Sequence, residues 1–301
     1  MRSLGKYILS GTAQAVGVIS FLSIFSLIIP PSAFLLSGTP LAMLTLRKGA
    51  KPALQVMAGS LCLCLLLTLV TGIEPLFALI LLLTIWLPVW LCAVVLRVTE
   101  SQVYMALTAA LIGFTFVVFM YLYVGDVEGW WRSLLTETPM QGFPGATEEQ
   151  YKQIMELAPP LMNAAIASSI VFSLLVTLFL GRCWQASLFN PGGFGEEFRA
   201  FRLPRQLALP TMLGIGLLFL EGNIVVALVR DTLAIVLTLY LIQGVVAVHR
   251  TVKLRGLARN WLVAMYCLLF ILPQIMVIFL AWMGITDSLM KLPKDGGEGK
   301  H

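Results

Sequence analysis

Charged side chains are scarce in this sequence: Asp, Glu, Lys and Arg make up 12% of its 301 residues, about half the share of an ordinary soluble domain. Hydrophobic residues make up 59%. A water-soluble fold needs polar residues on its surface, and a disordered chain needs low hydrophobicity, so the composition excludes both. A lipid bilayer is the solvent that fits, because an apolar exterior costs nothing there.

The sequence also lacks the usual signatures of catalysis. It has two histidines, His249 and His301, and it contains neither an HExxH nor a GxSxG motif. The apolar segments carry no paired carboxylates. We therefore expect no enzymatic activity and no cofactor.

Cysteines are few and have no metal-ligand spacing. The five are odd in number, which implies no disulfide framework, and we expect them to be small apolar packing residues. They are Cys62, Cys64, Cys92, Cys183 and Cys267. No metal site is predicted.

What the chain has instead is a series of continuous apolar runs, close to the ~20 residues that a spanning helix needs. They lack the alternation of lipid-facing strands, so the expected fold is all-α. We predict a polytopic transmembrane helix bundle of about nine spans, with a short or interrupted second span, forming a single integral membrane domain over residues 1–301. The runs are residues 7–29, 32–46, 52–71, 75–96, 102–124, 160–183, 207–229, 231–249 and 260–284.

The distribution of basic residues predicts the orientation. If the spans alternate, most of the 20 Lys and Arg lie on the side of the N-terminus. We therefore expect an integral membrane protein with a cytoplasmic N-terminus. The outer loop is then residues 125–159, the inner loop residues 184–206, and the C-terminus is outside. The net charge of +5 is explained by this bias and by attraction to membrane lipids, so no nucleic acid is expected as a partner.

Both long loops contain helix signals. In the outer loop, Thr147 and Gln150 have the spacing of a capping box, which predicts a short helix; a solvated connector is the alternative. In the inner loop, the sequence NPGG at 190–193 predicts a turn, followed by an interfacial helix at 196–201. The arginines of this loop would contact lipid phosphates or, alternatively, dock a cytoplasmic partner. They are Arg199, Arg202 and Arg205.

Few ionisable residues lie inside the spans, where one at the bilayer centre costs roughly 2.5–3.5 kcal/mol. We place an outer turn at Arg230 and Asp231, with Asp231 capping the next helix. Glu221 then lies about two turns below it. It is either hydrogen-bonded within the bundle or, with Asn223, lines a ligand cavity.

The second span is interrupted by the sequence SGTP at residues 37–40. An interrupted helix exposes backbone groups that only protein or a cavity can satisfy, so Ser37 and Thr39 are candidate ligand-binding residues; a plain short helix is the alternative. Three further polar residues are candidates for ligand binding: Asn163, Gln243 and Gln274. The alternative is that they hold helices together through interhelical hydrogen bonds. Pro273 predicts a kink in the last span.

Small residues recur at four-residue spacing in the first span. Such pairs permit close helix contact, either within the chain or with another membrane protein. They are Gly11 with Ala15 and Ala13 with Gly17.

Short motifs near both ends of the chain resemble the YybS-like family of uncharacterised bacterial membrane proteins. They are YLIQGVVAVH at 240–249, KLRG at 253–256, GITDS at 284–288, and the stretch from PL at 40–41 to LRKG at 46–49. That family is distantly similar to the membrane-embedded S components of energy-coupling-factor vitamin transporters, which pack small residues of an early helix against a membrane coupling subunit. This chain departs from them in having more than the usual six spans.

The resemblance implies a protein of the bacterial cytoplasmic (inner) membrane. It also implies a solute- or lipid-binding component of a transport system, and a coupling subunit as partner. The alternative is a non-transporting scaffold that organises an envelope complex. The sequence has no nucleotide-binding motif, so any use of ATP requires a partner.

Overall fold

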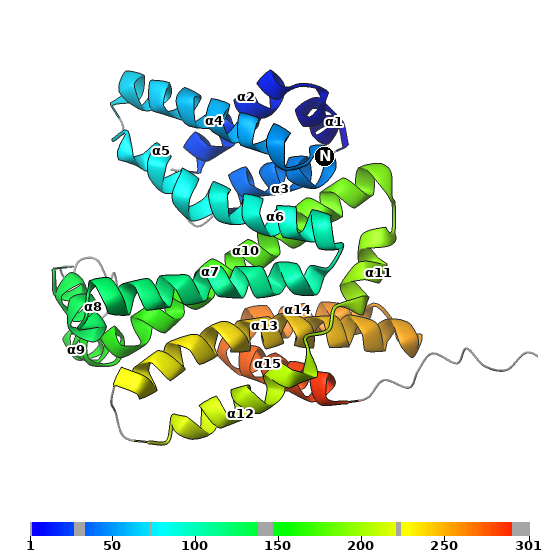
Figure 1. Ribbon diagram of the computed structural model, residues 1–301. Helices are drawn as coiled ribbons and strands as arrows, with labels where there is room; N and C mark the ends of the chain where they lie inside the picture. The colour runs from blue at the N-terminus through cyan, green and yellow to red at the C-terminus, as the bar shows by residue number, and fades with distance from the viewer. Residues whose placement is uncertain (1, 27–33, 73, 138–146, 221–223, 291–301) are drawn as a thin grey trace, which may run out of the picture. The chain divides into compact units, whose positions relative to one another are not determined.

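The computed structural model describes residues 2–26, 34–72, 74–137, 147–220 and 224–290, and every regular element in these ranges is a helix (Figure 1). This confirms the predicted all-α class. The chain divides into two compact units. Unit 1 comprises Met1–Thr115 with Ser169–Phe198, and unit 2 comprises Phe116–Ser168 with Arg199–His301.

Within the described ranges, five helices are long and apolar enough to cross a membrane. They are α4 (Ala50–Thr71), the continuous segment Leu76–Thr99, α7 (Gln102–Tyr123), α10 (Pro159–Phe189) and α13 (Ile224–Leu254). Three shorter apolar helices add to them: α2 (Thr12–Phe25), α14 (Asn260–Ile271) and α15 (Pro273–Leu289). The structure thus has the helices of an integral membrane protein, whereas the nine predicted spans are not confirmed.

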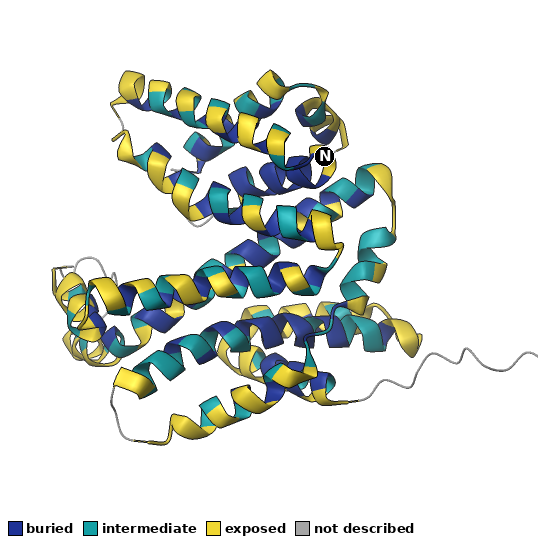
Figure 2. Cartoon of the chain, viewed as in Figure 1, coloured by how far each residue is buried: buried dark blue, intermediate teal, exposed yellow. Residues whose placement is uncertain are grey.

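The long helices carry apolar residues on exposed faces, which Figure 2 shows as yellow stripes along α4 and α7. Leu69 and Val70 of α4 and Leu122 of α7 are among the most exposed. In water such faces would be a liability, but in a bilayer they are the surface that lipid tails cover.

Unit 1 is built around α3 (Thr39–Lys48), in which every residue from Thr39 to Leu46 is buried. A helix that is apolar on all sides is typical of a protein core. The second apolar run therefore forms a buried helix, which at 10 residues is too short to span a membrane. A π-helical turn at Phe34–Gly38 leads into it. The surrounding elements are α1 (Arg2–Ser10), α2, α4, α5 (Leu76–Leu81), a π-helical turn (Leu82–Trp86), α6 (Leu87–Thr99), and parts of α7, α10 and α11 (Gly193–Ala200).

Unit 2 contains the long helix α13, which packs chiefly against α15. The contact is close because it has glycines on both sides: a Cβ at Gly244 would overlap the carbonyl of Leu280, and one at Gly284 would overlap that of Tyr240. The other elements are the remaining parts of α7 and α10, α8 (Val127–Thr136), α9 (Glu148–Leu157), a 3-10 turn (Arg205–Leu207), α12 (Ala208–Leu217) and α14.

Two local predictions are confirmed. Thr147 and Gln150 form a reciprocal capping box at the start of α9. The last apolar run breaks at Leu272 and Pro273 into α14 and α15, because proline cannot donate the hydrogen bond that would continue the helix.

The expected turn at Arg230 and Asp231 is wrong. Helix α13 runs through both residues without interruption from Ile224 to Leu254, and α12 ends at Leu217. The sequence from 224 to 243 contains neither glycine nor proline, while Gly222 precedes it, so the helix-breaking residues lie before α13 and not at its second turn.

Candidate functional site

Asp231 is the hub of a polar cluster in unit 2, and its side chain is fully buried. Its Oδ2 accepts hydrogen bonds from the hydroxyl of Tyr121 at 3.0 Å and from Nδ2 of Asn163 at 2.6 Å. Its Oδ1 lies 3.4 Å from Nε of Arg230. The cluster joins α7, α10 and α13, and it gives a buried carboxylate the donors and the opposite charge that such a group requires.

A pocket of about 540 Å³ adjoins this cluster. Tyr121, Asn163 and Arg230 line it together with residues from the start of α8 and α10 and from the first turns of α13. Its volume lies within the range of small-molecule sites. The remaining lining residues are Gly125, Asp126, Val127, Glu128, Pro159, Pro160, Ile224, Val226 and Ala227.

Within this pocket, the amide of Asn163 is only half satisfied. The residue is 2% exposed, and its Oδ1 has no hydrogen-bond partner among the described residues. Turning the amide over would place Oδ1 against the carboxylate of Asp231 and lose the 2.6 Å hydrogen bond, so the orientation is fixed. A buried acceptor without a donor costs about 1–3 kcal/mol, which a ligand donor would recover.

The two acidic residues that line the pocket already have partners. The Asp126 side chain accepts from the backbone N–H of Gly129 at the start of α8, and Glu128 pairs with Arg132 at 2.9 Å. Asn163, by contrast, has a buried acceptor, Oδ1, that finds no donor in the described part of the chain, and a ligand N–H or O–H is the kind of group that would satisfy it.

Gln243 belongs to a second polar network of unit 2. Its Oε1 accepts from the backbone N–H of Leu203 at 2.9 Å, and its Nε2 donates to Asp287 at 2.9 Å. Arg250 also donates to Asp287, at 3.1 Å, and to the carbonyls of Arg199 and Phe201. Gln243 is thus used to attach the segment before α12 to α13 and α15.

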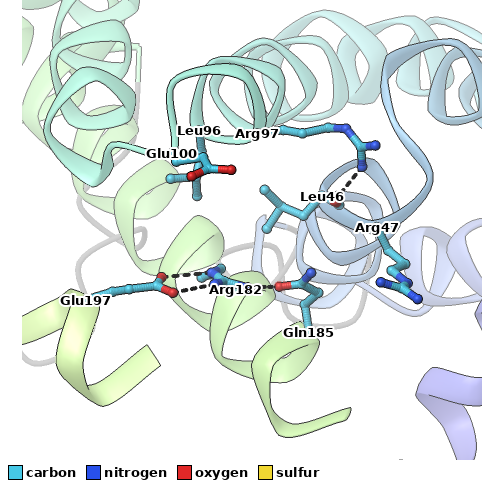
Figure 3. A pocket seen from close by; sticks show the side chains of 8 residues that line it. All are labelled: Leu46, Arg47, Leu96, Arg97, Glu100, Arg182, Gln185 and Glu197. Atoms are coloured by element: carbon cyan, nitrogen blue, oxygen red, sulfur yellow. Dashed lines mark hydrogen bonds and ion pairs between the residues drawn. The ribbon is translucent and has the colours of Figure 1, made fainter. Parts of the chain in front are cut away.

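Unit 1 has a pocket of about 600 Å³ with three arginines in its wall, which we call the arginine pocket (Figure 3). Arg182 forms an ion pair with Glu197, with Nε and Oε2 2.9 Å apart, and also contacts Gln185. Arg97 donates from Nη1 to the carbonyl of Leu46 at 2.6 Å. The wall is completed by Arg47, Leu96 and Glu100.

The other predicted ligand-binding residues are distributed across the chain. Glu221 and Asn223 lie outside the described residues. Ser37 and Thr39 are buried in the core of unit 1, where a Cβ at Gly38 between them would press on Thr177, so the interruption serves close packing. Gln274 is exposed on α15. None of the three described residues lines the pocket beside Asn163.

The small residues of the first predicted span differ in how far they are buried. Gly11 separates α1 from α2 and is half-buried, and Ala15 is fully buried within unit 1. Ala13 and Gly17 are exposed, and a Cβ at Gly17 would meet no atom within 4 Å among those described. Only the Ala13 and Gly17 face is therefore open to a partner.

The arginines of the inner loop make contacts within the chain. Arg202 donates to the carbonyls of Asp287 and Met290 at the end of α15, and the carbonyl of Arg199 accepts from Arg250. Arg205 is exposed. Arg202 thus has a structural contact that the sequence prediction of partner docking did not include.

Sequence reasoning missed Tyr121 and misplaced Asp231. The signal for Asp231 was available, since the apolar stretch on either side of it has no helix breaker. Tyr121 had no local signal, because a tyrosine near the end of an apolar helix is ordinary at a membrane interface.

Comparison of the chain with protein-family models, with curated proteins and with solved structures finds no match.

Proposed function

We propose that this protein is a membrane-embedded binding protein for a small polar ligand, held in the pocket beside Asn163, and that it serves a transport system. The observation that carries the proposal is that Asn163, which lines a pocket of about 540 Å³, has a buried Oδ1 without a hydrogen-bond partner among the described residues. Because this atom can only accept, the ligand carries an N–H or O–H group, as an ammonium or a hydroxyl compound does.

The pocket is suited to a ligand because its polar floor is preorganised. Asn163 is held by Asp231, and Asp231 is held in turn by Tyr121 and Arg230. The ligand therefore meets an acceptor that pays no ordering cost on binding. Apolar contacts with Val226 and Ala227 supply the rest of the contact surface.

Filling the pocket tests the proposal without disturbing its polar floor. Ala227 lines the pocket, and Ala227→Phe would occupy its volume. Val225, two residues away, is exposed and does not line the pocket, so Val225→Phe adds the same ring as a matched control. The three proteins are purified in detergent, and the small molecules that they release on denaturation are identified by mass spectrometry.

The expected result is one polar compound at fixed stoichiometry in the wild type and in Val225→Phe, and its loss in Ala227→Phe. The proposal fails if the wild type releases no such compound, or if Ala227→Phe retains it at the same stoichiometry while its thermal unfolding matches the wild type.

The role in transport rests on the resemblance to S components. The motifs that carry it include Gln243, Gly244 and Gly284, which the structure places in the contact of α13 with α15 and in the network at its end. These residues support a shared helix packing and carry no information about the ligand. In the same proposal the protein lies in the bacterial inner membrane with its N-terminus in the cytoplasm, as the basic residues favour.

A scaffold is the second candidate, favoured by the exposed Ala13 and Gly17 on α2. Gly17→Leu would block a partner helix while leaving the chain folded, because the added side chain meets open space. Ala15→Leu is the contrasting variant, since it overfills a buried site and should lower the unfolding temperature. Loss of a co-purifying membrane protein in Gly17→Leu alone would support the scaffold; no change would remove this face from consideration.

A further inference from the structure

We propose that the arginine pocket of unit 1 binds the phosphate group of an anionic phospholipid. This site is independent of the pocket beside Asn163, since all of its lining residues belong to unit 1. Nothing in the proposed transport role requires it, so the two proposals stand or fall separately.

The position of the pocket along its helices indicates the headgroup level of a membrane. Arg97 lies two residues before the end of the apolar segment Leu76–Thr99, and Arg47, the next-to-last residue of the buried helix α3, lines the same pocket. Apolar spanning segments end where the hydrocarbon core gives way to headgroups. Phosphates of the lipid are therefore the anions present at the highest local concentration beside these arginines.

Two of the three arginines have no compensating carboxylate. In the described part of the chain, Arg182 pairs with Glu197, whereas neither Arg47 nor Arg97 lies in an ion pair. Arg97 directs Nη1 at the carbonyls of Leu46 and Thr45, at 2.6 and 3.5 Å, which leaves Nε and Nη2 for a ligand. A guanidinium matches the geometry of a phosphate with two parallel hydrogen bonds, which makes this residue type the usual partner for the group.

Arg47 is held ready by an aromatic ring. Its Cζ lies 4.0 Å from the centre of the Phe189 ring, at the last residue of α10. A guanidinium held over a ring face by this attraction has lost part of its conformational freedom, so binding an anion costs it less ordering. Figure 3 shows the guanidinium groups of Arg47 and Arg97 on one side of the Leu46 side chain and Glu100 on the other.

The remaining lining residues fit a lipid headgroup. Leu46 and Leu96 give the pocket an apolar part that can contact the glycerol backbone, and about 600 Å³ is enough for a headgroup. The Glu100 carboxylate can accept a hydrogen bond from a hydroxyl of that headgroup. A glycerol-bearing headgroup such as that of phosphatidylglycerol satisfies both the arginines and Glu100.

The test measures lipid binding by native mass spectrometry of the detergent-purified full chain, with dioleoylphosphatidylglycerol or dioleoylphosphatidylcholine added. Arg47→Gln is the main variant, because Arg47 is exposed and its removal leaves the contact of Arg97 with α3 intact. Arg255→Gln is the matched control: it removes the same charge from an exposed position that does not line the pocket. Arg97→Lys is a second variant that keeps the charge and loses the two-pronged geometry.

The expected result is a preference for phosphatidylglycerol in the wild type, with affinity about tenfold lower in Arg47→Gln, lower in Arg97→Lys and unchanged in Arg255→Gln. Equal affinity in Arg47→Gln and Arg255→Gln, with both folded, overturns the proposal. A parallel arm titrates glycerol phosphate. If that soluble ester binds with the same dependence on Arg47 while phosphatidylglycerol does not, the lipid is overturned as the source of the phosphate.

Discussion

Asn163 of α10 donates to Asp231 of α13 across 2.6 Å, and solvent reaches almost nothing of either side chain. The two residues are 68 positions apart in sequence. Because a hydrogen bond to a buried carboxylate is strong and its loss leaves a desolvated group, the pair fixes the relation of the two helices within unit 2. The same pair holds the free acceptor of the pocket in place.

Replacing Asn163 with Ala should therefore lower the stability of the protein by about 1–3 kcal/mol, since Asp231 loses its shortest hydrogen bond. Gln274 is the matched control, because it is an exposed amide on α15 and its side chain makes no hydrogen bond among the described residues. Thermal unfolding in one detergent compares the variants. Equal melting temperatures for Asn163→Ala and the wild type would contradict the structural role of the pair.

Gly244→Ala should destabilise unit 2 by about 1–3 kcal/mol or more, because the added methyl group overlaps the backbone of α15 at Leu280. Backbone cannot move aside as the end of a flexible side chain can. Gly216→Ala provides the control: it is also helical, and an added Cβ there meets no described atom within 4 Å. If both variants melt like the wild type, the close contact of α13 with α15 is wrong.

Asp287→Ala should cost up to about 3–5 kcal/mol, because it leaves Arg250 and the buried Gln243 without their carboxylate. It should also speed tryptic cleavage after Arg202, whose guanidinium contacts the end of α15. Glu148→Ala breaks an ion pair with Lys152 whose two side chains are about three-quarters exposed, so it should change neither measurement. Unchanged cleavage in Asp287→Ala would show that the network does not anchor this segment.

The predicted topology places α9 outside and α11 inside. Glu149 and Glu196 are exposed residues of these helices and suit single-cysteine labelling in a background without the five native cysteines. Glu149→Cys should react with an impermeant thiol reagent added to intact cells, and Glu196→Cys should react only after the cells are opened. Reaction of both in intact cells would exclude the orientation.

The sequence alone was sufficient for the fold class and for several local structures. Scarce charge and long apolar runs indicate a helical membrane protein, because over such runs a helix forms all of its backbone hydrogen bonds within its own segment. The capping box at Thr147 and the break at Pro273 were also predictable, since each depends on residues within one turn.

The tertiary structure decided what the polar residues do. Asn163 and Gln243 are both amides in apolar helices, and the sequence around each gives no reason to assign them different roles. Gln243 has partners for both ends of its amide, whereas Asn163, which lines a pocket, has a partner for one end only among the described residues. That difference comes from residues 40 to 70 positions away, and interactions at such separations leave no periodic signal in the sequence.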